Sequence, residues 1–288
     1  MIAELTQLLI NGLLSGTLLA VPAIGFTAIY AVLRFPNFAV ASHATIGAYA
    51  GFIANVWFGL PAWVALLAAF IAAGIVGVVS DELVLRRLRS SGPMTVAIAS
   101  VALTIVLENL VRFSFGNDLL GYDLPVLRDW RFSGLRVGPQ QLQNAAAAAA
   151  AMAALFLFLA FTRTGKMMRA VADNPMLAAL KGIDALTVAR LANFAGMGLA
   201  GFGGMLIGLD TSIDPLTGFR VMLSVFAAAV VGGLGSIPGA VLGAFVVGVG
   251  EELSLVVLDP SYRTAVGFVA ILVVLSFRPR GLLGERAY

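Results

Sequence analysis

The sequence predicts an all-α polytopic membrane protein with about eight transmembrane segments, including a broken or re-entrant helical hairpin. Of the 288 residues, 60% are hydrophobic and only 11% are charged, whereas soluble domains carry about 25% charged residues. The mean hydropathy is +0.98. Apolar runs of about 20 residues, the length that crosses a bilayer as a helix, recur along the chain. No stretch is typical of a soluble domain, so we expect residues 1–288 to form one transmembrane domain.

The chain lacks the residues that several classes of protein function require. The chain has no cysteine, which excludes disulfides and thiolate metal sites. His43 is its one histidine, which excludes His-rich metal or haem sites. There is no Walker loop, so the chain cannot hydrolyse ATP itself, and no catalytic cluster indicates an intramembrane enzyme. Basic residues in such a chain set topology, so the net charge of +3 does not indicate nucleic acid.

Apolar runs place the spans along the chain. They lie at about 5–33, 38–58, 62–80, 94–115, 142–161, 188–209 and 262–277, with a further apolar stretch at 221–250. Pro22 predicts a kink in the first span. That span has no basic flank of the kind that precedes a signal sequence, so we expect it to be retained.

The basic residues predict the orientation. Twelve of the 18 lie near Arg34, in the two polar segments 81–89 and 163–190, or after Phe277, and basic residues collect on the cytoplasmic side. The N-terminus is therefore predicted outside and the C-terminus inside. Parity then requires the stretch 221–250 to enter and leave by the same face, as two half-helices that meet between Gly232 and Gly239. Irregular backbone in a membrane must be buried in protein or line a wet cavity, so we expect this segment near a translocation route.

The longest polar island, residues 162–190, contains both lysines of the chain. Its charges exclude it from hydrocarbon, and it shows the pattern of a short helix. Asn174 is a capping residue before Pro175 at the first helical position, and Gly182 ends the helix. We expect a cytoplasmic element that docks something outside the membrane, with a plain connecting loop as the alternative. The residues expected to form or flank its contact surface are Arg169, Asn174, Met176, Leu177, Ala179, Leu180, Lys181 and Gly182.

Polar and small residues within the spans are candidates for a translocation pathway. Glu108 and Arg112 are one helical turn apart and form either a structural ion pair or part of the pathway. A lone membrane histidine such as His43 is more often a hydrogen-bonded packing residue than a proton carrier. Glu251 and Glu252 are expected to be solvated at the outer end of the interrupted stretch. The pathway candidates are Asn11, Asn37, His43, Thr45, Glu108, Asn193, Gly232, Gly235, Ser236 and Gly239.

Two glycine-rich series have a spacing of four residues. They are Gly235, Gly239, Gly243 and Ala200, Gly204, Gly208. Small residues on one face of a helix let two backbones approach closely. We therefore expect helix packing at both series, with a gating hinge as the alternative.

Five segments resemble one family. They are Asn11-Gly12 with Gly25, Asn37-Phe-Ala39, Arg169-Ala170 through Lys181-Gly-Ile183, Val231-Gly-Gly-Leu-Gly-Ser-Ile-Pro-Gly-Ala240, and Arg278-Pro-Arg-Gly-Leu-Leu-Gly284. Together they are similar to the permeases of branched-chain amino acid ABC importers of the LivH type, over almost the whole chain. One segment departs from the family, which often has His-Gly-Glu where this chain has Val40-Ala-Ser42. That departure leaves the cargo open.

The resemblance implies an ABC importer permease fold in a bacterial inner membrane. It implies a second related permease subunit, two cytoplasmic ATPases that hold ATP and Mg²⁺, and a periplasmic binding protein. This chain itself would bind no cofactor. The segment 163–187 would be the coupling helix region, and the chain would import branched-chain or related hydrophobic amino acids.

Two alternatives stay open. The same machine could import urea, short amides or small aromatic acids. A stand-alone secondary transporter or channel is less well supported, because ion-driven carriers usually need carboxylates near mid-membrane. Glu108 is the one candidate for that role, and an arginine lies beside it.

Overall fold

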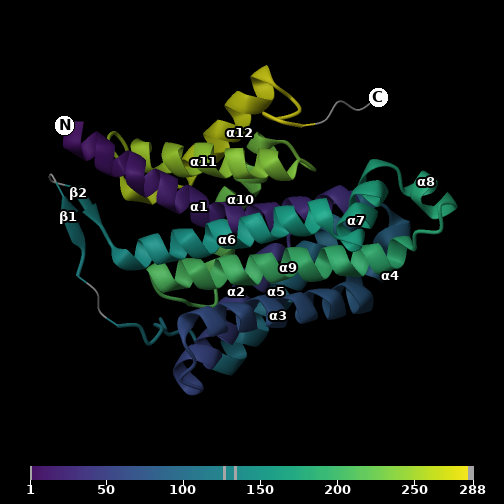
Figure 1. Cartoon of the computed structure of the whole chain (residues 1–288), viewed down its shortest axis with the longest axis horizontal. Coiled ribbons are helices and arrows are strands. Elements are labelled where there is room, and N and C mark those ends of the chain that lie inside the picture. The colour runs from purple at the N-terminus through teal and green to yellow at the C-terminus, as the bar shows by residue number, and fades with distance from the viewer. Residues whose placement is uncertain (1, 126–127, 133–134, 285–288) are drawn as a thin grey trace.

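Long apolar helices lying side by side make up most of the structure, a computed structural model that describes residues 2–125, 128–132 and 135–284 (Figure 1). The main helices are α1 (Ile2–Leu33), α2 (Val40–Phe52), α3 (Ala62–Ser80), α5 (Pro93–Phe115), α6 (Pro139–Phe161), α9 (Ala185–Asp210), α10 (Thr217–Gly232), α11 (Ile237–Ser254) and α12 (Ala265–Phe277). Three shorter helices are α4 (Arg86–Leu88), α7 (Arg163–Asp173) and α8 (Pro175–Leu180). Turns of π-helix continue α2 and α3, over Ile53–Trp57 and Asp81–Leu85.

The described residues contain six helices that are long and apolar enough to cross a membrane, and two shorter apolar helices, α10 and α12. This confirms the predicted all-α polytopic class.

The helix bounds follow local sequence signals. Pro93 and Pro139 start α5 and α6, because proline fits the first helical turn, where its missing N–H is not needed. The carboxylate of Asp184 caps α9 by accepting from the backbone N–H groups of Leu186 and Thr187.

Helices α1 and α9 form the centre of the bundle. In each, 72% of the most apolar window is buried within the chain, compared with 28% in α5 and α6. The peripheral helices therefore present apolar side chains outward. Close backbone contacts hold the centre together: a β-carbon on Gly47 of α2 would lie 2.1 Å from the Cα of Gly201 in α9. Only glycine permits that approach.

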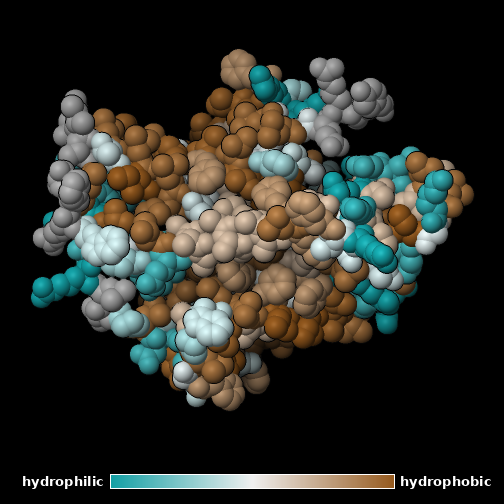
Figure 2. Space-filling view, in the orientation of Figure 1, coloured by the Kyte–Doolittle hydropathy of each residue, from teal (hydrophilic) through white to brown (hydrophobic). Residues whose placement is uncertain are grey.

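Polar and apolar residues are distributed over the surface as in a membrane-spanning protein. Figure 2 shows a broad hydrophobic area in the middle of this face, with hydrophilic groups at its two ends. One hydrophilic end lies over α7 and α8, and the other lies near β1, β2 and the start of α6 (Figures 1 and 2).

A two-stranded hairpin lies in the polar segment between α5 and α6. Strands β1 (Trp130–Phe132) and β2 (Leu135–Val137) pair antiparallel. The side chain of Gln7 in α1 donates to the carbonyl of Arg136 at 2.8 Å and accepts from its backbone N–H at 2.8 Å. The hairpin is thereby fastened to the N-terminal end of α1, a contact that the local sequence pattern does not indicate.

The link between α1 and α2 is irregular for longer than the sequence predicts, since α2 begins only at Val40. Two side chains of α5 satisfy its exposed backbone. The N–H of Phe38 donates to the hydroxyl of Ser100 at 2.9 Å, and the hydroxyl of Thr104 donates to the carbonyl of Phe38 at 3.1 Å. Irregular backbone inside a membrane protein needs such partners.

Candidate functional site

The polar island folds as two helices, α7 and α8, at one end of the bundle (Figure 1). The predicted capping of α8 is confirmed, because the side-chain oxygen of Asn174 accepts from the N–H of Leu177 at 2.9 Å. Gly182 follows the helix with a φ of +80°, the left-handed conformation that glycine adopts without strain. The preceding α7 was not predicted. Thr162 caps it by accepting from the N–H of Gly165 at 2.9 Å.

Apolar side chains of α8 are exposed. Met176 is 78% exposed, Leu177 53% and Leu180 79%, and Ala179 is exposed beside them. Ala178 is buried and turns the opposite face towards the body. No described part of the chain therefore covers the apolar face of α8 that the sequence predicts as a contact surface.

The base of α8 is firmly held. Met168 and Val171 of α7 are buried in the main core, and the guanidinium of Arg34 donates to the carbonyl of Ala172. The basic residues expected around the surface, Arg169 and Lys181, are exposed. An apolar helix with basic neighbours is thus presented on a fixed support.

Asp184 connects this surface to the central helix α9. The hydroxyl of Thr187 donates to its carboxylate at 2.5 Å, and the backbone N–H groups of Leu186 and Thr187 also bond to it. These hydrogen bonds, that of the Thr187 hydroxyl first, lower the pKa of Asp184 from its ordinary value. The cap is therefore ionised at neutral pH.

The interrupted stretch 221–250 is an antiparallel helical hairpin of α10 and α11, as predicted. The hydroxyl of Ser236 caps α11 by accepting from the N–H of Gly239 at 3.2 Å. The tip packs against the C-terminal tail: Leu282 and Leu283 donate to the carbonyls of Val231 and Gly232 at 2.8 and 2.9 Å. The last two carbonyls of α10 are thus satisfied by the chain's own tail.

The first glycine series divides into two roles. A β-carbon on Gly243 would lie 2.0 Å from the carbonyl oxygen of Ala228 in α10, and one on Gly239 would lie 2.4 Å from that of Gly232. Gly235 has a φ of +94° and open space around it. It serves the turn and not helix packing. In the second series, a β-carbon on Gly204 would lie 2.0 Å from the carbonyl oxygen of Ala44 in α2.

Four polar pathway candidates are buried in the subunit. His43 is fully buried, with Nδ1 2.6 Å from the carbonyl of Ala39 and Nε2 3.4 Å from the hydroxyl of Ser80. Thr45 accepts from the N–H of Gly218 at 3.0 Å. Asn37 accepts from the N–H of Ala39 at 3.1 Å. Asn193 is fully buried. The contacts of His43 fit a packing role.

The two remaining polar candidates lie elsewhere. Glu108 pairs with Arg112 at 3.2 Å on the peripheral helix α5, as the structural alternative expects. Asn11 lines a cavity of 330 Å³ near the N-terminal end of α1. The translocation pathway candidates thus lie in several parts of the subunit, and their role stays a prediction.

The expectation that Glu251 and Glu252 are solvated is wrong. They are only 4% and 6% exposed. Arg263 lies 2.5 Å from a carboxylate oxygen of Glu252 and 3.7 Å from one of Glu251. The hydroxyl of Ser224 donates to Glu251 at 2.5 Å. Helices α10 and α11 and the turn before α12 thus bring the compensating groups together.

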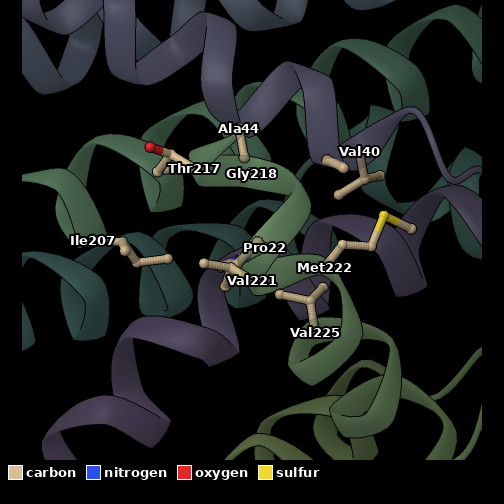
Figure 3. A pocket seen from close by; sticks show the side chains of 11 residues that line it. Pro22, Val40, Ala44, Ile207, Thr217, Gly218, Val221, Met222 and Val225 are labelled. Carbon is tan, nitrogen blue, oxygen red and sulfur yellow. The ribbon is translucent and has the colours of Figure 1, made fainter. Parts of the chain in front are cut away.

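A second, very small space lies between α1, α2, α9 and α10. It has a volume of 10 Å³ and an almost entirely apolar lining that includes Pro22, Val40 and Met222 (Figure 3). A cavity of about this size holds at most one water molecule. It is a packing gap and offers no passage through the subunit.

Comparisons with known proteins identify the family. The profile of the family described as "Branched-chain amino acid transport system / permease component" matches residues 8–275. The chain belongs to this family. The permease is 32% identical to the high-affinity branched-chain amino acid transport permease BraD of Pseudomonas aeruginosa, over 97% of this chain and 95% of that protein. It is 31% identical to the corresponding LivH of Escherichia coli, with the same coverage.

A solved structure supports the fold. The permease resembles a chain of PsaBC from Streptococcus pneumoniae, solved with a Fab, with a TM-score of 0.51, 15% identity and 97% of each chain covered. The expected permease fold and multi-pass membrane location are therefore confirmed. The family also confirms a transport subunit rather than an enzyme, and its place in a transport system implies ATPase and binding-protein partners.

Proposed function

We propose that the permease forms half of the translocation pathway of an ATP-driven importer for branched-chain or related hydrophobic amino acids. A second, related permease supplies the other half in a bacterial inner membrane. Two cytoplasmic subunits hold ATP and Mg²⁺, and a periplasmic binding protein delivers the cargo. The segment 163–187, and α8 within it, couples the ATPases to this subunit.

The exposed apolar face of α8 carries this proposal. Its leucines would fill a groove on an ATPase subunit, with Arg169 and Lys181 at the rim. Buried apolar anchors dominate retention of a partner, and rim charges mainly govern encounter. The capped helix stands on α7, which is packed into the core, so a displacement of α8 would be transmitted to the bundle.

Substitution of the two most suitable anchors tests the proposal. Leu177→Asp with Leu180→Asp should release the ATPases, or leave them hydrolysing ATP without dependence on substrate. Co-purification of the ATPases and uptake in proteoliposomes are the measurements. Leu119→Asp is the matched control, because Leu119 is 66% exposed in the loop after α5. Normal uptake and normal ATPase retention in the double variant would reduce α8 to a connector.

The cargo proposal rests on the relatives and on the location of the one family departure. BraD and LivH are named as permeases for branched-chain amino acids. The departing segment, residues 40–42, lies at the contact between α2 and α10, where a β-carbon on Gly218 would be 1.8 Å from the carbonyl oxygen of Ala41. This supports a packing role for the departure. Measuring which amino acids, amides or urea the partner binding protein retains would decide the cargo.

A further inference from the structure

A cavity of 330 Å³ opens at the end of the bundle that holds the N-terminus of α1. Ligand pockets in proteins span roughly 300–1,000 Å³. Residues of α1, α6, α9, α10 and α11 line it, together with Thr211 and the turn before α12. We call it the outer cavity, because the predicted topology places this end outside.

One part of the outer cavity is strongly charged. Its lining contains three carboxylates and two guanidinium groups, from Asp210, Glu251, Glu252, Arg220 and Arg263. The guanidinium of Arg263 is shared between the two buried glutamates. The cavity lining therefore carries one more negative than positive charge.

The other two charged side chains of the lining, those of Asp210 and Arg220, have fewer partners within the chain. Asp210 is exposed at the end of α9, and its carboxylate interacts electrostatically with Arg263 but forms no side-chain hydrogen bond with the described residues. Arg220 bonds to Asp214 through one terminal nitrogen, yet 62% of its side chain stays exposed. A carboxylate without a side-chain hydrogen bond and a largely exposed guanidinium thus line the same space.

The remaining lining is mixed: Asn11, Ser15, Gln141, Thr211, Ser224 and Thr264 are polar and uncharged, and five further residues form an apolar part. Leu14, Leu18 and Leu19 of α1, Ile207 of α9 and Val221 of α10 contribute to it. A ligand that fits this lining has an ammonium group, a carboxylate and an aliphatic side chain. The carboxylates do not indicate a metal ion, because no group of three or more metal-binding side chains occurs among the described residues.

We propose that the outer cavity is a binding site for an aliphatic α-amino acid. Asp210 receives the ammonium group, Arg220 the carboxylate, and the leucines of α1 the side chain. This rests on the proposed function and adds to it a site within this subunit. Glu251, Glu252 and Arg263 are positioning residues that hold α10, α11 and the turn before α12 around the site.

Direct binding to the assembled permease–ATPase complex, without its binding protein, tests the proposal. Radiolabelled L-leucine is titrated onto the complex in nanodiscs. We expect saturable binding that weakens at least tenfold in Asp210→Asn, because a charged hydrogen bond is lost. Arg220→Gln should weaken it similarly, and Arg220→Lys should restore part of it. Asp118→Asn is the matched control, since Asp118 is an exposed acid in the loop after α5.

Two analogues separate binding from a structural role. Leucinol lacks the carboxylate and 4-methylpentanoate lacks the ammonium group, so each should compete at least tenfold more weakly than leucine. Three results would each overturn the site. They are competition by either analogue as strong as that of leucine, unchanged affinity for leucine in Asp210→Asn, and no saturable binding by a complex that takes up leucine. Failure of the complete wild-type importer to take up any branched-chain amino acid would instead overturn the proposed function.

Discussion

A β-carbon on Gly232 would lie 2.1 Å from the carbonyl oxygen of Gly239. The two glycines bring the ends of α10 and α11 into backbone contact across the tip of the hairpin. Gly235, between them, has a φ of +94° and no neighbour within 4 Å of an added β-carbon. Neighbouring glycines of one motif are therefore required for different reasons.

Alanine substitutions should separate these two reasons. Gly239→Ala forces the helices apart and should abolish uptake while the subunit still inserts. Gly235→Ala meets only the conformational penalty of a positive φ, about 1–2 kcal/mol, and should retain uptake with a lower unfolding temperature. Uptake in proteoliposomes and thermal unfolding of the purified complex are the measurements. Equal loss of uptake in both variants would contradict the distinction.

The cap of α8 gives a milder prediction. Asn174→Ala removes the acceptor for the N–H of Leu177 and should cost about 1 kcal/mol of local helix stability. Hydrogen exchange of the α8 amides should accelerate by roughly fivefold, and ATPase retention should weaken without being lost. Asn174→Asp keeps a capping oxygen and is the control. Identical exchange in all three proteins would show that the cap does not stabilise the helix.

The charge distribution predicts an outer N-terminus and an inner C-terminus. Because the chain has no cysteine, single cysteines report topology directly. Gly284 is a poor position, since an added β-carbon would lie 1.9 Å from the carbonyl oxygen of Arg280. Leu119 and Leu180 are 66% and 79% exposed at the two predicted faces. An impermeant maleimide applied from outside should label Leu119→Cys and spare Leu180→Cys, and the reverse pattern would invert the topology.

Arg263 compensates two buried carboxylates. Arg263→Gln leaves Glu251 and Glu252 without a cation and should destabilise the protein by about 3 kcal/mol, as when one partner of a buried ion pair is removed. Thermal unfolding of the purified complex measures this loss. Adding Glu252→Gln to Arg263→Gln should recover part of the lost stability. A larger unfolding loss in the double variant than in Arg263→Gln would exclude the pairing as the cause.

The stability loss in Arg220→Gln can be compared with that in Arg263→Gln. Asp214, the partner of Arg220, also accepts from the N–H of Leu216 and the hydroxyl of Thr217, both at 3.1 Å. Because these bonds remain, the loss of unfolding stability should be smaller than for Arg263→Gln.

Local patterns in the sequence determined much of the fold. The predicted span 62–80 coincides with α3, and α5, α6 and α9 begin within a few residues of the expected positions. Asn174 and Gly182 bound α8 as predicted. These features depend on helix length, caps and proline positions, which act within a few residues and can be read from the chain in order. The helical hairpin followed from charge parity between the spans.

Tertiary structure alone decided which polar groups meet. Nothing near Glu251 and Glu252 in the sequence shows that Arg263, in the turn before α12, forms ion pairs with both buried carboxylates. Likewise, Ser100 and Thr104 satisfy the backbone of Phe38 from more than 60 positions away, and the side chain of Gln7 anchors the hairpin at Arg136 from 129 positions away. Burial, ion pairing and cavity shape depend on helices packed from distant parts of the chain, whereas helix formation depends on neighbours along it.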